Sequence, residues 1–260
     1  MVMKPFKLIL SIIILILLFF LGSARSSNSS IWHNKAKGIS FASIKLSYGE
    51  PDEFLSFIRI DPKIYRAKVL SAKKFGNQSL TVKEIAEKSG AVAVINASYF
   101  DENEEPLGYL KINGKVHNDY IAEPIIYSGI ITVTNGKIDI LHRSNFKSEN
   151  CDEAVQIGPR LISNQKETQG IKNTIDYKKK ARRAGMAVDK NGNILLFKTS
   201  KAIASWEQII LTIMSNPSLN IVEAINLDGG SSTQIYVKSG SFEFNEGNAY
   251  VPTAIGFYKK

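Results

Sequence analysis

Residues 228–233 combine an acid, two glycines and three hydroxyl side chains, two residues after the apolar run 221–225. The apolar run is typical of a buried strand. Glycines let the backbone turn tightly and let a ligand approach it, and successive backbone N–H groups in such a turn can hold an anion. We therefore predict a carboxylate at a strand end, Asp228, beside an anion-binding loop formed by Gly229, Gly230, Ser232 and Thr233. The alternative is an ordinary turn with a solvated Asp228, because Asp-Gly is a common turn pair.

A second group of polar side chains follows another apolar run, residues 91–95. Asn96 comes directly after this run and Tyr99 three residues later, so both are predicted just past a strand end. Asn96 suits a hydrogen bond to a sugar or a phosphate, and the ring of Tyr99 suits packing against a sugar. The alternative for Asn96 is a cap on the turn after its strand.

Two arginines are candidates for binding an anionic group. Arg160 follows Gly158-Pro159, a pair that fixes the backbone beside it. Arg183 ends the basic segment 178–183, whose lysines are otherwise typical of a solvated loop. Arginine makes bidentate, permanently charged contacts to phosphate. We predict Arg183 as the anion clamp and Arg160 as a second candidate, with an ordinary surface charge as the alternative for Arg160.

The composition indicates a globular protein with an anionic partner. The chain has 260 residues, 44% of them hydrophobic and 22% charged, which excludes a disordered chain and suits one large domain. The net charge of +9 favours a phosphate-bearing glycan, a cell-wall polymer or a membrane surface. Nucleic acid would also suit this charge, but predicted export argues against it.

The amino terminus is predicted to be a secretory signal peptide over residues 1–24. Lys4 and Lys7 precede an apolar run at residues 8–21, and Gly22-Ser23-Ala24 is typical of a cleavage site. The apolar run is shorter than the roughly 20 residues of a membrane span, although an uncleaved anchor at residues 8–22 is the alternative. We expect a linker at residues 25–37 and an exported domain at residues 38–260, on the cell surface, in the periplasm or outside the cell.

No cofactor is expected from the residue types. Cys151 is the single cysteine and allows no internal disulfide, and His33, His117 and His142 do not show metal-ligand spacing. No nucleophile elbow or phosphate-binding lysine loop occurs. A divalent cation held by Asp228 with hydroxyl and carbonyl oxygens is a minor alternative.

The pattern along the chain predicts one α+β domain with a mixed, mainly antiparallel sheet and about two main helices. Alternating apolar residues and Asn-Gly turns indicate strands and hairpins. The ranges are 38–48, 54–61, 65–71, 91–95, 108–116, 125–133, 138–142, 185–189, 194–198, 221–225, 234–238 and 251–258. Thr81 with Glu84 forms a capping box for a helix that ends at Gly90. Ser205 is predicted to cap a second helix that ends before Pro217.

Five blocks of the sequence, taken in order, resemble the phosphodiester glycosidase family. They are residues 96–100 (NASYF), 156–161 (QIGPRL), 182–189 (RRAGMAVD), 226–233 (NLDGGSST) and 251–256 (VPTAIG). The resemblance covers about residues 40–258, nearly the whole predicted mature chain. Three departures from the family pattern occur: Ala97 and Ser98 replace two glycines, Ser231 replaces a third, and Ala184 stands where the family has threonine.

The resemblance implies an exported glycosidase that hydrolyses a sugar-1-phosphodiester bond in an envelope or extracellular glycan. Such a reaction passes through an oxocarbenium-like state that needs a carboxylate, and the phosphate leaving group needs charge neutralisation. Asp228 is the predicted carboxylate, Arg183 the phosphate clamp, and Asn96 a third catalytic residue. Asp101, Asp189 and Glu223 are candidate second carboxylates.

Two alternatives place the chain in other functional classes. One is a binding module for anionic glycans on the same scaffold, with a shallow basic surface and no catalytic pocket. The other is an envelope-assembly protein that the amino-terminal segment holds in the membrane. The enzyme hypothesis differs from both, because it requires Asp228, Asn96 and Arg183 to converge in one site.

Overall fold

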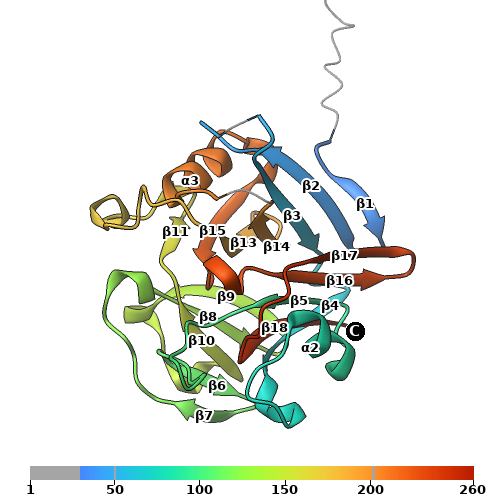
Figure 1. Ribbon diagram of the computed structural model, residues 1–260, viewed down its shortest axis with the longest axis vertical. Helices are drawn as coiled ribbons and strands as arrows, with labels where there is room; N and C mark the ends of the chain where they lie inside the picture. Colours follow the sequence, from blue (N-terminus) through green and yellow to red (C-terminus); the bar gives the residue numbers. More distant parts are fainter. Residues whose placement is uncertain (1–29, 50, 201–202) are drawn as a thin grey trace, which may run out of the picture. The chain divides into compact units, whose positions relative to one another are not determined.

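The computed structural model describes residues 30–49, 51–200 and 203–260, and residues 31–260 form one compact unit (Figure 1). All strand pairings among the described residues are antiparallel. The two α-helices described are α2 (Val82–Ser89) and α3 (Trp206–Met214). The predicted α+β class is therefore confirmed. The predicted signal peptide at residues 1–24 lies outside the described residues.

The largest sheet has eight strands in the order β1-β2-β3-β14-β13-β15-β11-β12. They are β1 (His33–Ala36), β2 (Ile39–Lys45), β3 (Phe54–Ile60), β11 (Arg160–Ser163), β12 (Lys166–Glu167), β13 (Ala184–Asp189), β14 (Ile194–Thr199) and β15 (Ile221–Asn226). Helix α3 covers one face of this sheet (Figure 1). Its buried residues Trp206, Ile209 and Ile213 are spaced three and four apart, so they lie on one side of the helix.

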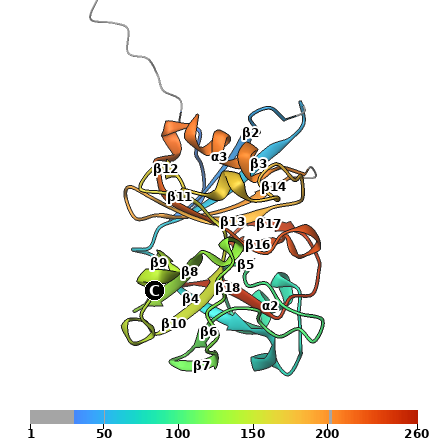
Figure 2. The ribbon, with the colours of Figure 1, turned by 90° about the vertical axis from the view of Figure 1, so that its left-hand side faces the viewer.

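Two five-stranded sheets form the rest of the unit (Figure 2). One has the order β7-β6-β10-β8-β9, with β6 (Leu110–Ile112), β7 (Lys115–Asn118), β8 (Gly129–Thr134), β9 (Lys137–His142) and β10 (Glu153–Ile157). The other has the order β17-β16-β5-β18-β4, with β4 (Tyr65–Ser71), β5 (Ala93–Asn96), β16 (Ile235–Ser239), β17 (Phe242–Glu246) and β18 (Thr253–Lys259). Residues of all three sheets share one central hydrophobic core. Helix α2 packs on the β5-containing sheet through Val82 and Ile85.

Local sequence signals account for much of this arrangement. The Asn-Gly pairs at 113–114 and 135–136 have positive φ at both residues, as a tight hairpin turn requires. Both predicted helix starts carry capping boxes, at Thr81 and at Ser205.

Several predicted boundaries differ from the structure, and β10 and β11 lie outside every predicted strand. β8 begins at Gly129, because residues 125–127 form a 3-10 turn after Pro124. The folded unit also begins before residue 38, since β1 lies within the predicted linker and pairs with β2. The ring of Trp32, which precedes β1, packs edge-on against Phe57 with 6.5 Å between centroids.

The ends of several strands meet where the eight-stranded sheet adjoins the two smaller sheets. The start of β13 and the end of β15 are neighbours, since Gly185 pairs with Asn226. The chain leaving β15 contacts the chain leaving β5, because Asp228 N donates to Ala97 O over 3.1 Å. The segment between β10 and β11 joins them, with Asn226 N donating to Pro159 O over 3.0 Å. Four of the sequence blocks are thereby brought together.

Gly185 packs closely against Phe197 and the backbone of Ile225, and its replacement tests this packing. A Cβ atom there would lie 2.0 Å from Cζ of the buried Phe197 and 2.7 Å from the carbonyl oxygen of Ile225. We expect Gly185→Ala to lower the free energy of unfolding by about 1–3 kcal/mol, because the core must move to admit the methyl group. Denaturant unfolding measures this loss. An unchanged midpoint and slope would contradict the packing described.

Candidate active site

Asp228 lies in a short loop between β15 and a 3-10 turn at residues 230–232. Its side chain is half-buried, and its carboxylate accepts hydrogen bonds from the Ser232 hydroxyl and the Gly229 N–H. Burial nevertheless dominates and raises the pKa of Asp228 from 3.8 to about 6, while the two hydrogen bonds oppose this rise. A solvated turn carboxylate would not behave this way. The group is therefore poised to change protonation near neutral pH.

The backbone of the glycine pair has a structural task that differs from the predicted anion-binding loop. The Gly229 N–H bonds the Asp228 carboxylate, and the Gly230 N–H donates to Arg182 O over 2.9 Å. A Cβ atom at Gly229 would lie 2.8 Å from the same Arg182 oxygen, so a side chain there would clash with backbone. The two N–H groups thus fix Asp228 and the basic segment, and are not free for a substrate anion.

Asn96 also serves the loop rather than projecting toward a ligand. Its side chain is fully buried, with 0% exposure. Its amide donates to Asp228 O over 2.7 Å and accepts from Gln234 N over 3.1 Å. Both ends of the amide are committed, so the predicted direct contact with sugar or phosphate does not fit this geometry. Asn96 positions the backbone that carries Asp228.

Tyr99 lies beside Asp228 with its hydroxyl fixed in place. The hydroxyl donates to Gly158 O over 2.6 Å and accepts from the Asn226 side chain over 3.2 Å. Burial raises the pKa of Tyr99, the negative charge of Asp228 raises it further, and the positive charge of Arg183 lowers it. Tyr99 is therefore neutral and lies within the fields of both charged groups.

Arg183 is a buried cation, with 7% exposure. Its Nε donates to Ala204 O over 3.2 Å, and one terminal nitrogen donates to Lys179 O over 2.8 Å. The guanidinium also stacks over Trp206, 4.7 Å from the ring centroid. Burial lowers the pKa of Arg183, but an arginine in a protein remains charged.

No carboxylate forms an ion pair with Arg183 among residues 30–49, 51–200 and 203–260. The two carbonyl bonds use two of its five N–H donors and leave the others for a ligand. The charge of Asp176 acts on Arg183 without forming an ion pair with it, and a buried, positioned cation outside any ion pair is a suitable anion site. The predicted phosphate clamp therefore has the required chemistry.

Arg160, the second candidate clamp, is occupied elsewhere. Its guanidinium bonds Glu223 and the Ser163 hydroxyl, each over 2.6 Å. The same contact accounts for Glu223, a candidate second carboxylate, which also accepts from the Asn164 N–H over 2.9 Å. The structure does not bring this ion pair to Asp228.

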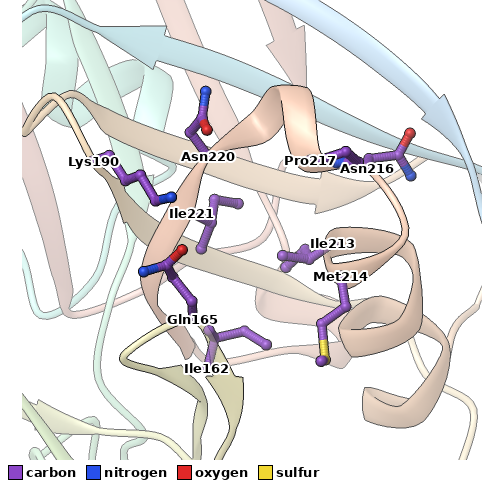
Figure 3. Close-up of a pocket in the computed structure, with 9 residues that line it drawn as sticks. All are labelled: Ile162, Gln165, Lys190, Ile213, Met214, Asn216, Pro217, Asn220 and Ile221. Atoms are coloured by element: carbon purple, nitrogen blue, oxygen red, sulfur yellow. The ribbon is translucent and has the colours of Figure 1, made fainter.

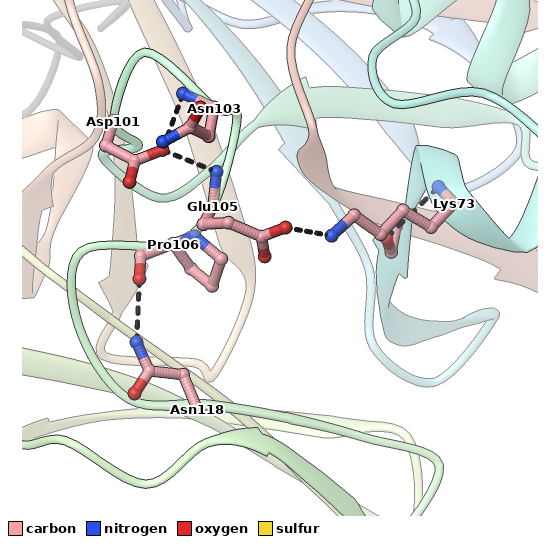
Figure 4. A network of polar contacts seen from close by, with 7 residues as sticks. Lys73, Asp101, Asn103, Glu105, Pro106 and Asn118 are labelled. Carbon is pink, nitrogen blue, oxygen red and sulfur yellow. Dashed lines mark hydrogen bonds and ion pairs between the residues drawn. The ribbon is translucent and has the colours of Figure 1, made fainter.

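The two other candidate carboxylates are bound in turns. Asp189 lies at the end of β13 remote from Arg183 and accepts from Asn191 N and from Asn193. Asp101 follows Tyr99 in a loop and accepts from the N–H groups of Asn103 and Glu105 (Figure 4). Glu105 in turn pairs with Lys73 and draws this loop toward β4. Neither Asp101 nor Asp189 has a hydrogen bond to the Asp228 loop.

The departures from the family pattern are accommodated within the fold. Ala97 and Ser98 are buried, and the Ser98 hydroxyl bonds the Thr253 hydroxyl over 2.5 Å. Ser231 is exposed at the turn. Thr233 Oγ1 is buried and has no hydrogen-bond partner in the described part of the chain. Ala97 and Ser98 therefore fill space behind the loop, and a ligand contact by Thr233 stays a prediction.

Asn226 holds the candidate site together, although the sequence did not single it out. Its buried amide donates to Gly158 O over 3.0 Å and to the Tyr99 hydroxyl, and it accepts from Trp206 Nε1 over 3.0 Å. The guanidinium of Arg183 stacks on the ring of Trp206. Asn226 bonds both Trp206 and Tyr99, and so it links the environment of Arg183 to Tyr99. One signal was available: a polar amide at the end of an apolar strand must find buried partners.

A separate cavity lies between α3 and the start of β15 (Figure 3). Ile213, Lys190 and Ile221 are among the residues that line it. Ile221 begins β15 and Asp228 follows its end, so at about 3.3 Å per residue the cavity is roughly 20 Å from Asp228. It does not belong to the candidate site.

A metal ion also has no ready cluster of ligands in the described residues. No group of three or more His, Cys, Asp or Glu side chains there could hold one. A cation bound by Asp228 with hydroxyl or carbonyl oxygens involves other ligand types and stays a prediction.

Comparison with known proteins identifies a matching family and solved structures with a similar fold. The sequence profile described as phosphodiester glycosidase matches residues 89–258. A search of the curated proteins found no match.

Two solved structures share the fold. One is the catalytic domain of zebrafish N-acetylglucosamine-1-phosphodiester alpha-N-acetylglucosaminidase, auto-inhibited by its pro-peptide. It has a TM-score of 0.63 and 16% identity, with 91% of this chain and 86% of that chain covered. The other is a hypothetical protein from Synechocystis, with a TM-score of 0.64 and 17% identity. That match covers 88% of this chain but only 63% of the Synechocystis chain.

The pKa of Asp228 predicts a pH-dependent gain of stability on removing its charge. A rise from 3.8 to about 6 costs the folded state roughly 3 kcal/mol once the carboxylate is ionised. The pKa of Asp228 is higher in the folded state than in the unfolded state. The free energy of unfolding of the wild type therefore falls by this amount as pH rises from about 4 through 6. We expect Asp228→Asn to be more stable than the wild type at pH 8, with the difference vanishing near pH 4. Urea unfolding from pH 4 to 8 measures it, and a difference independent of pH would contradict the burial of this charge.

Proposed function

We propose that this chain, which belongs to the phosphodiester glycosidase family, hydrolyses the bond between C1 of a sugar and the oxygen of a phosphodiester. The observation that carries the proposal is a half-buried carboxylate, Asp228, whose loop contacts a buried cation, Arg183, that forms no ion pair within the described residues. Tyr99 lies in the fields of both. A sugar phosphodiester offers the matching charges, an incipient cation at C1 and an anion at phosphorus.

The reaction needs little more than these groups. The bond from C1 to the phosphate oxygen breaks, and the oxygen of a water molecule bonds to C1 through an oxocarbenium-like state. We assign Asp228 to stabilise this state and to take the proton of the attacking water. The products are the free sugar and a phosphate monoester, whose charge Arg183 neutralises. A phosphate is a good leaving group, so a second carboxylate as general acid is not required.

The surroundings of Arg183 support an anionic substrate. The side chains of Lys178, Lys179, Lys180 and Arg182 are exposed next to it. The Arg183 side chain donates a hydrogen bond to Lys179 O, and the Gly230 N–H donates one to Arg182 O. The second bond joins the basic segment directly to the loop that carries Asp228. An exposed cluster of one charge sign raises the local concentration of oppositely charged substrate. A phosphate-containing glycan or glycoconjugate fits this requirement.

We also propose that the substrate lies outside the cytoplasm, in an envelope or extracellular glycan. The motivation is the predicted signal peptide at residues 1–24. Within the described residues, neither helix has the length and apolarity to cross a membrane. Determination of the mature amino terminus in secreted and membrane fractions tests export. An intact terminus in the soluble cytoplasmic fraction would contradict it.

Turnover by the mature domain, residues 25–260, tests the reaction itself. The panel would contain sugar-1-phosphodiesters, including that of N-acetylglucosamine, the sugar in the name of the zebrafish protein. We expect Asp228→Asn to lower kcat at least 1,000-fold, about 4 kcal/mol, while the fold remains intact. In the wild type, kcat/KM should fall as pH drops below about 6, because the base must be ionised. Full activity of a folded Asp228→Asn protein would remove Asp228 from this role.

The role of Arg183 is tested by comparing charged and neutral substrates. Arg183→Ala is expected to lower kcat/KM for a phosphodiester at least 100-fold, about 3 kcal/mol, and to affect an uncharged aryl glycoside far less. Arg183→Lys keeps the charge but not the planar fork, so an intermediate loss is expected. Steady-state kinetics on both substrates measures the split. Equal losses on the two substrates would show that Arg183 only supports the fold.

A further inference from the structure

A second tyrosine lies against the site. The rings of Tyr99 and Tyr127 meet edge to face, with 5.3 Å between centroids and 78° between planes. Both side chains are half-buried, so each presents part of its ring to the surface. We call this pair the aromatic corner. Tyr127 belongs to a segment for which the sequence predicted a strand, and so its position had no functional interpretation.

The segment that carries Tyr127 is held rigidly. Gln156 is buried, and its amide donates to Ala122 O over 2.7 Å and to Tyr127 O over 2.9 Å. The same amide accepts from Ala122 N over 2.9 Å. The N–H of Tyr127 donates to Pro124 O over 2.8 Å. A ring on such a fixed backbone can bind a ligand without a large loss of conformational freedom.

The charge of Asp228 acts on the Tyr127 hydroxyl. The negative charge of Asp228 raises the pKa of Tyr127, after burial as the larger cause, and Tyr120 adds to the rise. Arg183 influences Tyr99 but is not among the groups that influence Tyr127. Asp228 therefore acts on both tyrosines of the aromatic corner, and the ring contact places Tyr127 directly beside Tyr99.

The two tyrosines differ in what their hydroxyls do. The Tyr99 hydroxyl is committed to Gly158 O and to the Asn226 amide. The Tyr127 hydroxyl has no hydrogen bond to any residue within the described ranges, and its burial keeps it neutral. A ring face with a free polar tip suits a ligand that is apolar on one face and carries hydroxyl groups at its edge.

We propose that Tyr127 forms the sugar subsite, so that the sugar ring packs against the aromatic corner while the phosphate lies on Arg183. This orientation places C1 of the sugar beside Asp228, between the two subsites. The inference rests on the proposed hydrolysis for the identity of the ligand, but it concerns binding and not turnover. It adds Tyr127 to the sugar contact that the sequence predicted for Tyr99.

Binding of the two halves of the substrate tests this polarity. The probes are sulfate, for the phosphate half, and a sugar panel of N-acetylglucosamine, glucose and galactose, each titrated calorimetrically into the mature domain. We expect Tyr127→Ala to weaken the best-bound sugar at least tenfold and to leave sulfate within twofold. Tyr127→Phe should retain most of the sugar affinity, since it keeps the ring. Arg183→Ala should show the reverse pattern, with sulfate lost and sugar retained.

Tyr48→Ala is the matched control, because Tyr48 is 88% exposed and lies in the turn between β2 and β3. It should change neither affinity. Unaltered sugar binding by Tyr127→Ala, equal loss of both probes, or absence of sugar binding by the wild type would each overturn the subsite. If the expected pattern appears but no phosphodiester is hydrolysed, the subsite stands and the proposed catalysis fails.

Discussion

The buried amide of Asn226 is the interaction on which the rest of the site depends. It bonds the Gly158 carbonyl, the Tyr99 hydroxyl and the indole of Trp206, with donor–acceptor distances of 3.0–3.2 Å. Three segments remote in sequence are thereby tied to the end of β15, two residues before Asp228. Without Asn226 the buried indole N–H of Trp206 would lose its hydrogen bond, at about 1–3 kcal/mol, while the Tyr99 hydroxyl would keep its bond to Gly158 O. The constraint is therefore cooperative, and it sets the position of Arg183 through the ring of Trp206.

Within this frame the protein holds two opposite charges that do not neutralise each other. The Asp228 carboxylate has a pKa raised to about 6 by burial, and its hydrogen bonds come from its own loop. The Arg183 guanidinium is bound by neutral carbonyl groups and an aromatic face. Both arrangements lower stability in the absence of a ligand, because each charge is desolvated without a counter-ion. Desolvated charges of this kind, beside an otherwise apolar core, are typical of a site that binds charge.

The sequence predicted the fold class, and the reasons are local, whereas the roles of Asp228 and Arg183 stay predictions. Hairpin turns such as 135–136 and the capping box at Thr81 depend on residues close in the chain. By contrast, whether a polar group faces a ligand or the backbone depends on partners far away. The Asn96 side-chain oxygen accepts a hydrogen bond from Gln234 N, and the Gly230 N–H donates one to Arg182 O. Tyr127 was missed because its segment alternates like a strand, whereas the buried Gln156 holds it in a turn.

The most direct test of the account is the titration of the Asp228 carboxyl group by carbon-13 NMR, with Asp228→Asn to assign the signal. Titration with added sulfate, which keeps its charge across this range, reports on the anion site at Arg183. The account predicts a pKa near 6 for the free protein and a higher value with sulfate bound, because a second anion disfavours the carboxylate. A pKa near 3.8 that sulfate does not change would contradict both the burial of Asp228 and its proximity to an anion site.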